Sequence, residues 1–170
     1  DEDHDEEEHE EGHDDHGGLI LANYLQEDAE LDGYELEIGR VFNLASGDLE
    51  VSFSRDVVNG NLSSGMNIPR MSPARNIYSV GYSVNDYLFD LSFKDVDSQT
   101  DTAEEESATS GYQMLDAKLV RTFDLNGNSL RVSVFANNLL DEAARNHASF
   151  VKNQVPLPGK NFGLRFNLSF

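Results

Sequence analysis

The last ten residues of the chain alternate strictly between apolar side chains and small or polar ones. The apolar positions are Phe162, Leu164, Phe166, Leu168 and Phe170. Because successive side chains of a β-strand point to opposite faces, the segment predicts a strand with one apolar and one polar face. Such a strand fits the wall of a lipid-facing barrel or the outer sheet of a soluble sandwich, and the period alone does not separate the two.

The same alternation recurs through most of the chain. Strands are predicted near residues 19–42, 48–56, 76–84, 87–95, 112–124, 129–139 and 160–170, each antiparallel to its neighbours. Asn59-Gly60-Asn61 and Asn126-Gly127-Asn128 have the residues of turns. The connections alternate between short turns and long polar stretches, the latter at residues 55–75, 95–110 and 141–160. This sorting is typical of outer-membrane barrels, which have short periplasmic turns and long extracellular loops, and it predicts that the odd-numbered strands run toward the periplasm.

Three segments near the C-terminus carry a family resemblance. They are Asn137-Asn138-Leu139-Leu140-Asp141, then Arg145–Phe150, then Pro156-Leu157-Pro158-Gly159-Lys160-Asn161-Phe162. Their order resembles that of TonB-dependent outer-membrane receptors, in which Asn-Leu-Leu/Phe-Asp ends the penultimate strand. An extracellular loop follows in that family, and Pro-Gly-Arg/Lys-Asn-Phe then opens a last strand that ends in Phe. The segment Tyr24–Glu37 also looks like a barrel strand of this family.

The resemblance covers roughly residues 19–170 and implies an all-β fold. That fold is an antiparallel transmembrane β-barrel, of which this chain forms the C-terminal portion with about seven strands. The location implied is the bacterial outer membrane, in contact with its lipid. The family also implies active uptake, driven by the TonB energy-coupling complex through an upstream plug that these residues do not include.

Composition narrows the other possibilities. The chain has 170 residues, no cysteine and a formal net charge of −20. The absence of cysteine excludes disulfides and thiolate metal sites, and the negative charge argues against nucleic-acid binding. Asp1-Glu2-Asp3 does not resemble a secretory signal, and no run of eighteen apolar residues predicts a membrane helix. No catalytic set of nucleophile, base and orienting residue is recognisable, so we do not expect an enzyme.

Residues 1–18, DEDHDEEEHEEGHDDHGG, form a separate segment that is predicted to be a mobile extracellular loop. Its four histidines are His4, His9, His13 and His16. Neutral imidazole and carboxylate oxygen both bind Zn²⁺ well, and spacings of four and three residues would place pairs of histidines on one face of a helical turn. One interpretation is a zinc-capture loop, and the other is a solvated acidic segment with incidental histidines. The density of histidine favours zinc capture.

Two further sets of polar residues are weaker candidates. The acids between Asp95 and Glu106 are interpreted as a solubilising loop face in preference to an oxygen-only cation site. His147 is either a metal ligand or a hydrogen-bonding residue of its loop.

The sequence as a whole predicts part of a TonB-dependent receptor that takes up a metal, with zinc as the expected ion. One alternative is a receptor of the same class for haem or another metal chelate. The other is a soluble β-sheet module that binds metal.

Overall fold

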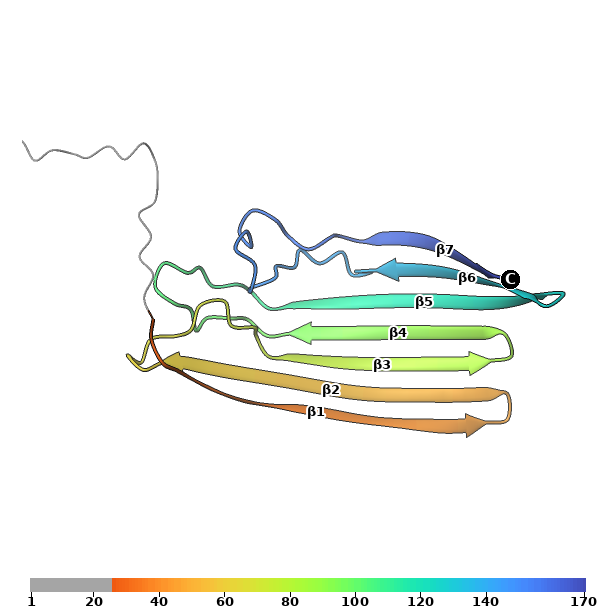
Figure 1. Cartoon of the computed structure of the whole chain (residues 1–170), viewed down its shortest axis with the longest axis horizontal. Helices are drawn as coiled ribbons and strands as arrows, with labels where there is room; N and C mark the ends of the chain where they lie inside the picture. The colour runs from red at the N-terminus through yellow and green to blue at the C-terminus, as the bar shows by residue number, and fades with distance from the viewer. Residues whose placement is uncertain (1–25) are drawn as a thin grey trace, which may run out of the picture.

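The computed structural model describes residues 26–170, which form a single seven-stranded sheet (Figure 1). The strands are β1 Ala29–Leu44, β2 Gly47–Leu62, β3 Arg75–Val84, β4 Tyr87–Val96, β5 Tyr112–Leu125, β6 Asn128–Asn137 and β7 Asn161–Ser169. Each strand is antiparallel to the next one in the sequence, so the predicted fold class and strand order are confirmed. Within these residues, no helix has the length and apolar character needed to cross a bilayer.

The connections differ in length at the two ends of the sheet, as predicted. Two-residue turns join β1 to β2, β3 to β4 and β5 to β6. The other end carries the first long loop (residues 63–74), the second (97–111) and the third (138–160), and Figure 1 shows the three side by side. In the β5–β6 turn, Asn126 and Gly127 have φ angles of 56° and 93°, which suit a type I′ hairpin turn.

The β1–β2 hairpin is longer than the sequence predicted. Asn59-Gly60-Asn61, which we expected to form a turn, lies inside β2 and pairs with Glu30–Asp32 of β1. Gly60 serves close packing here, since a Cβ at this position would lie 2.7 Å from the Ile68 Cδ1 atom. The turn prediction was wrong because the glycine and its asparagine neighbours were interpreted from local preference, whereas strand pairing determines their conformation.

The first strand begins later than predicted. Residues 26–28 are not part of a strand, and the expected strand residues 19–25 lie outside the described residues. The second strand ends at Leu62, six residues beyond its predicted end at residue 56. The other predicted strand ends agree with the structure to within about two residues, which is the usual scatter of such boundaries.

The sheet has almost no apolar interior of its own. Among residues 26–170, the buried hydrophobic side chains are Val96, Val120 and Ala144. A sheet normally buries its apolar face against a second layer, and the described residues supply no such layer. The large apolar side chains of one face are therefore left exposed.

Candidate functional site

An apolar band crosses one face of all seven strands. Residues that lie directly opposite each other in paired strands share a face, and the register places Ile38, Phe53, Tyr78 and Phe93 in one row across β1 to β4. On β7 and at the C-terminus the band consists of Phe162 (70% exposed), Leu164 (64%), Phe166 (64%), Leu168 (58%) and Phe170 (101%). Their partners on β6 are also apolar, so the predicted sharing of one face is confirmed for the positions within β7.

Aromatic rings and two arginines line the band near the short turns. The Arg40 guanidinium lies 5.0 Å from the centre of the Phe42 ring. The Arg121 guanidinium lies 4.9 Å from the Tyr87 ring and 4.5 Å from the Phe123 ring. Cation–π contacts of this kind let a charged side chain remain beside apolar surface. The rim of the band therefore carries positive charge in a chain that is otherwise strongly acidic.

The opposite face is polar and carries ion pairs between strands. The Arg75 Nε atom lies 2.6 Å from an Asp56 carboxylate oxygen, and the Lys118 Nζ atom lies 3.3 Å from an Asp90 oxygen. Both pairs are partly exposed, so each contributes little to stability. Arg165 belongs to this face because it lies opposite Ser133. With exceptions such as Ile77 and Leu88 on the polar face, the two faces separate into apolar and polar sets, as the alternation predicted.

Phe135 is an apolar exception on the polar face, and the structure explains it. It lies opposite Gly163, and a Cβ added to that glycine would clash with the Phe135 ring. The ring therefore covers the bare backbone of the glycine, an arrangement that stabilises glycine in a sheet.

The motifs on either side of the third long loop are hydrogen-bonded to each other. Asn138 is 2% exposed, and its Nδ2 group donates to the Pro158 carbonyl oxygen at 3.1 Å and to that of Glu142 at 2.9 Å. The Asp141 Oδ1 atom accepts the backbone N–H of Lys160 at 2.9 Å. Asn138 and Asp141 have φ angles of 50° and 57°, a region in which Asn and Asp are enriched. These residues close the base of the third long loop.

Glu106 of the second long loop joins all three long loops. Its carboxylate accepts the backbone N–H of Arg70 in the first loop at 3.0 Å. It also lies 2.8 Å from the Lys152 Nζ atom and 3.1 Å from the His147 Nε2 atom, both in the third loop. Thr109 completes the cluster, with its hydroxyl 2.9 Å from His147 Nδ1. His147 is 1% exposed and Lys152 is 5% exposed, so this is a buried charged cluster.

The electrostatics of this cluster fix its protonation states. Burial by itself raises the pKa of Glu106, but the Lys152 ammonium and the backbone N–H groups of Ala103 and Arg70 outweigh it and lower the pKa from 4.5 to about 2. Burial, with the charge of Lys152, lowers the pKa of His147 although Glu106 opposes this shift. A neutral His147 with its proton on Nε2 fits both contacts, since it donates to Glu106 and accepts from Thr109.

An open hollow of about 380 Å³ lies beside this cluster, between the three long loops. Arg70 and Phe150 form one part of it, with the guanidinium 3.6 Å from the ring centre. Glu104 and Glu105 contribute carboxylates, and Ser149 contributes a hydroxyl. The hollow therefore combines an aromatic surface with both signs of charge.

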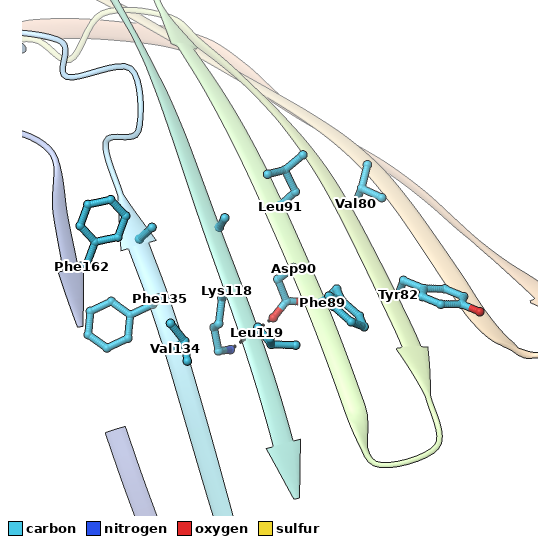
Figure 2. Close-up of a pocket in the computed structure, with 12 residues that line it drawn as sticks. Val80, Tyr82, Phe89, Asp90, Leu91, Lys118, Leu119, Val134, Phe135 and Phe162 are labelled. Carbon is cyan, nitrogen blue, oxygen red and sulfur yellow. Dashed lines mark hydrogen bonds and ion pairs between the residues drawn. The ribbon is translucent and has the colours of Figure 1, made fainter. Parts of the chain in front are cut away.

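A second hollow, of about 470 Å³, lies on the apolar band (Figure 2). Its lining spans β3 to β7 and includes Leu91, Leu119 and Phe162. Ala117 and Ala136 lie directly opposite each other within it, and their small side chains leave the surface low at this point.

The residues predicted to bind metal are not all within the described part of the chain. His4, His9, His13 and His16 lie outside the described residues, and so does the whole segment 1–18. Within residues 26–170, no group of three His, Asp or Glu side chains is arranged to hold a metal ion. His147 has the hydrogen-bonding role that we weighed against metal binding, because both of its ring nitrogens are engaged.

Sequence reasoning missed the cluster around Glu106. We interpreted Glu106 as part of a solubilising loop face, whereas its side chain is 9% exposed and paired with Lys152. The available signal was the scarcity of cations, since Lys152 is one of 12 lysines and arginines in the chain. A lysine in a long loop of so acidic a protein indicates that it is paired with a nearby carboxylate.

The fold belongs to the class of antiparallel all-β sheets, and it matches part of the barrel of a solved transporter structure. One solved structure to which it is similar is the copper transporter OprC, with a TM-score of 0.72 and 19% sequence identity. The match covers 84% of this chain and 24% of that chain, so the present chain spans about a quarter of the transporter's length. No protein-family model matches the chain, and no curated protein sequence matches it. At this level of identity, the similarity shows the fold.

Proposed function

We propose that the chain forms part of a TonB-dependent outer-membrane receptor that takes up a metal ion. The observation that carries this proposal is the exposed apolar band on a sheet that matches part of a transporter barrel. From Phe162 to Phe170 the band is about 26 Å long at about 3.3 Å per residue, which is about 20 Å along the membrane normal for a strand tilted by about 40°. The lipid-facing band of such barrels is about 25 Å tall. A soluble sheet would cover so large an apolar face.

The location and partners follow from this proposal. The apolar band contacts outer-membrane lipid, and the polar face lines the barrel interior. β1 and β7 each have one edge without a partner among residues 26–170, and lipid does not tolerate such edges. Further strands of the same barrel pair with them. An upstream plug couples the receptor to the TonB complex.

Zinc is our first candidate for the transported ion. It rests on the four histidines and eleven acids among the first sixteen residues, which offer nitrogen and oxygen ligands. Copper is a second candidate because OprC, a solved structure to which the chain is similar, is a copper transporter. Cu²⁺ binds a given set of nitrogen and oxygen ligands more tightly than Zn²⁺ does, so ligand type alone does not choose between the two ions.

A test combines location with metal content. The gene is deleted from its host and restored as wild type or as a variant in which His4, His9, His13 and His16 are all alanine. Zinc and copper in washed, metal-limited cells are measured by mass spectrometry, and the protein is traced in fractionated membranes. We expect the protein in the outer membrane, low zinc in the deletion strain, and partial rescue by the variant.

The outcomes separate the parts of the proposal. A protein found in the soluble fraction would refute the membrane assignment. A deletion that lowers copper and leaves zinc unchanged would replace zinc by copper as the ion. Unchanged contents of both metals would refute metal uptake.

A further inference from the structure

The hollow on the apolar band is a recess in a surface that, under the proposed function, faces lipid. It is formed where Ala117 of β5 and Ala136 of β6 lie opposite each other, between the larger Leu91, Leu119 and Phe162. An empty recess forfeits the dispersion contacts that its lining would make with a neighbour. The acyl chain of a lipid is flexible enough to fill such a space and is chemically matched to its apolar lining.

Arg121 lies where this hollow approaches the rim of the band. Arg121 follows Leu119 by two residues on the same face of β5, which places their Cα atoms about 7 Å apart. It lies opposite Tyr87 on β4 and Val132 on β6. Among the ion pairs of residues 26–170, none involves Arg121. Its guanidinium is held at 4.9 Å from the Tyr87 ring and 4.5 Å from the Phe123 ring.

The order of these features along β5 matches the order of groups in a phospholipid. An apolar recess is followed by a guanidinium at the rim, as acyl chains are followed by a phosphate. Arginine binds phosphate strongly because its planar N–H groups form two parallel, charge-assisted hydrogen bonds. Stacking on two rings fixes the orientation of the guanidinium before a ligand arrives, which lowers the entropic cost of binding.

We propose that this surface is a specific site for one glycerophospholipid. Its phosphate binds the Arg121 guanidinium, and one of its acyl chains lies in the hollow over Ala117 and Ala136. The site rests on the proposed membrane location and goes beyond it, because bulk lipid would require neither the recess nor the arginine.

Arg40 provides a matched control on the same face. It is also stacked on an aromatic ring, that of Phe42, at 5.0 Å. It lies on β1 opposite Val51 of β2, and no residue of β1 or β2 lines the hollow. Arg40 thus has the same charge and the same kind of ring contact without the adjacent recess.

The experiment uses the full-length protein, extracted from membranes and delipidated in detergent. Native mass spectrometry measures the binding of dioleoylphosphatidylglycerol and of dioleoylglycerol, which has the same chains without the phosphate. We expect the wild type to prefer the phospholipid. We expect R121Q to bind it about tenfold more weakly, which is the size of one charge-assisted hydrogen bond, and R40Q to be unchanged. A136L fills the recess with apolar atoms and should weaken binding several-fold.

Each contrary result has a distinct meaning. Equal binding of the two lipids by the wild type, or equal losses in R121Q and R40Q, would overturn the phospholipid site. A wild-type dimer that A136L converts to monomers would assign the hollow to a second copy of the chain and also overturn it. Membrane fractionation of the same variants separates this inference from the proposed function. If all variants remain in the outer membrane, a failed lipid site leaves the receptor proposal standing.

Discussion

Placing a charge on the apolar band of β7 tests the assignment of the two faces. Leu164 is 64% exposed, and it lies opposite Val134, which is also exposed on this face. If the band contacts lipid, Leu164→Arg moves a guanidinium into hydrocarbon. If instead the band faces water, the same substitution costs little, because exposed surface positions tolerate most changes within about 0.5 kcal/mol.

The geometry of the strand gives the size of the effect. Phe166 is the midpoint of the band between Phe162 and Phe170, and Leu164 is about 7 Å from it along the strand. For a strand tilted by about 40°, this distance is about 5 Å along the membrane normal. Half of the lipid-facing band of such barrels is about 12 Å along the membrane normal, so Leu164 lies closer to the midplane than to the interface. Arginine costs about 2–4 kcal/mol at the midplane and about 0–1 kcal/mol near the interface, so we expect about 2 kcal/mol.

The assay is denaturant unfolding of the full-length protein in phospholipid vesicles, followed by circular dichroism. Ser79→Arg is the matched control, because it introduces the same charge on the polar face, between Ser52 and Ser92. We expect Leu164→Arg to lower the free energy of unfolding by about 2 kcal/mol and Ser79→Arg to change it little. Equal effects of the two substitutions, or no effect of Leu164→Arg, would refute the assignment of the apolar face to lipid.

Four further predictions concern the long loops and residues 1–18. Glu106→Gln should speed amide hydrogen exchange in all three long loops and leave the strands unchanged, because it removes the charged partner of the buried Lys152. Because the pKa of Glu106 is lowered from 4.5 to about 2, wild-type loop protection should be complete above about pH 4.5 and be lost as the pH falls toward 2. Asn138→Ala leaves the carbonyl oxygens of Glu142 and Pro158 without a buried donor, and it should lower the free energy of unfolding by about 1–3 kcal/mol in denaturant unfolding. An unchanged midpoint would contradict the role of Asn138 in closing the base of the third long loop. Zinc titration of the full chain by calorimetry should show weaker binding below about pH 6.5, where imidazole takes up a proton, and no pH dependence once the four histidines of residues 1–18 are removed.

The strands could be predicted from the sequence because the alternation of apolar and polar side chains marks their positions. In a single-layer sheet with one apolar and one polar face, most residue types follow from the face they occupy, and the alternation of Phe162–Phe170 shows this clearly. Two exceptions are explained by the residues packed against them. Gly60 has sequence neighbours that favour a turn but packs closely against Ile68, and Phe135 is an apolar residue on the polar face that covers Gly163.

The loop cluster could not be predicted in the same way. Glu106 and His147 come from different loops, and no periodic pattern connects them. Their contact depends on how the second and third long loops fold over the end of the sheet. The hydrogen bonds of Asn138 and Asp141 that close the base of the third long loop could be predicted from the sequence only in part. The Asn-Leu-Leu-Asp and Pro-Gly-Lys-Asn-Phe motifs marked its two sides, while the bonds from Asn138 to Pro158 and from Asp141 to Lys160 required the structure.

The arrangement of charge in the described residues bears on how metal would be captured. His147 is the one histidine within residues 26–170, and it is committed to Thr109 and Glu106. Glu106 is itself paired with Lys152, whose ammonium neutralises the carboxylate in place of a metal ion. A metal ion would have to displace this lysine in order to bind there, and a buried ammonium left without its partner is costly. The cluster therefore serves to hold the long loops together, and the remaining histidines of the chain are those of residues 1–18. Under the proposed function, metal capture and loop architecture belong to different residues, so removal of the four histidines should weaken zinc binding without loosening the loop end of the sheet.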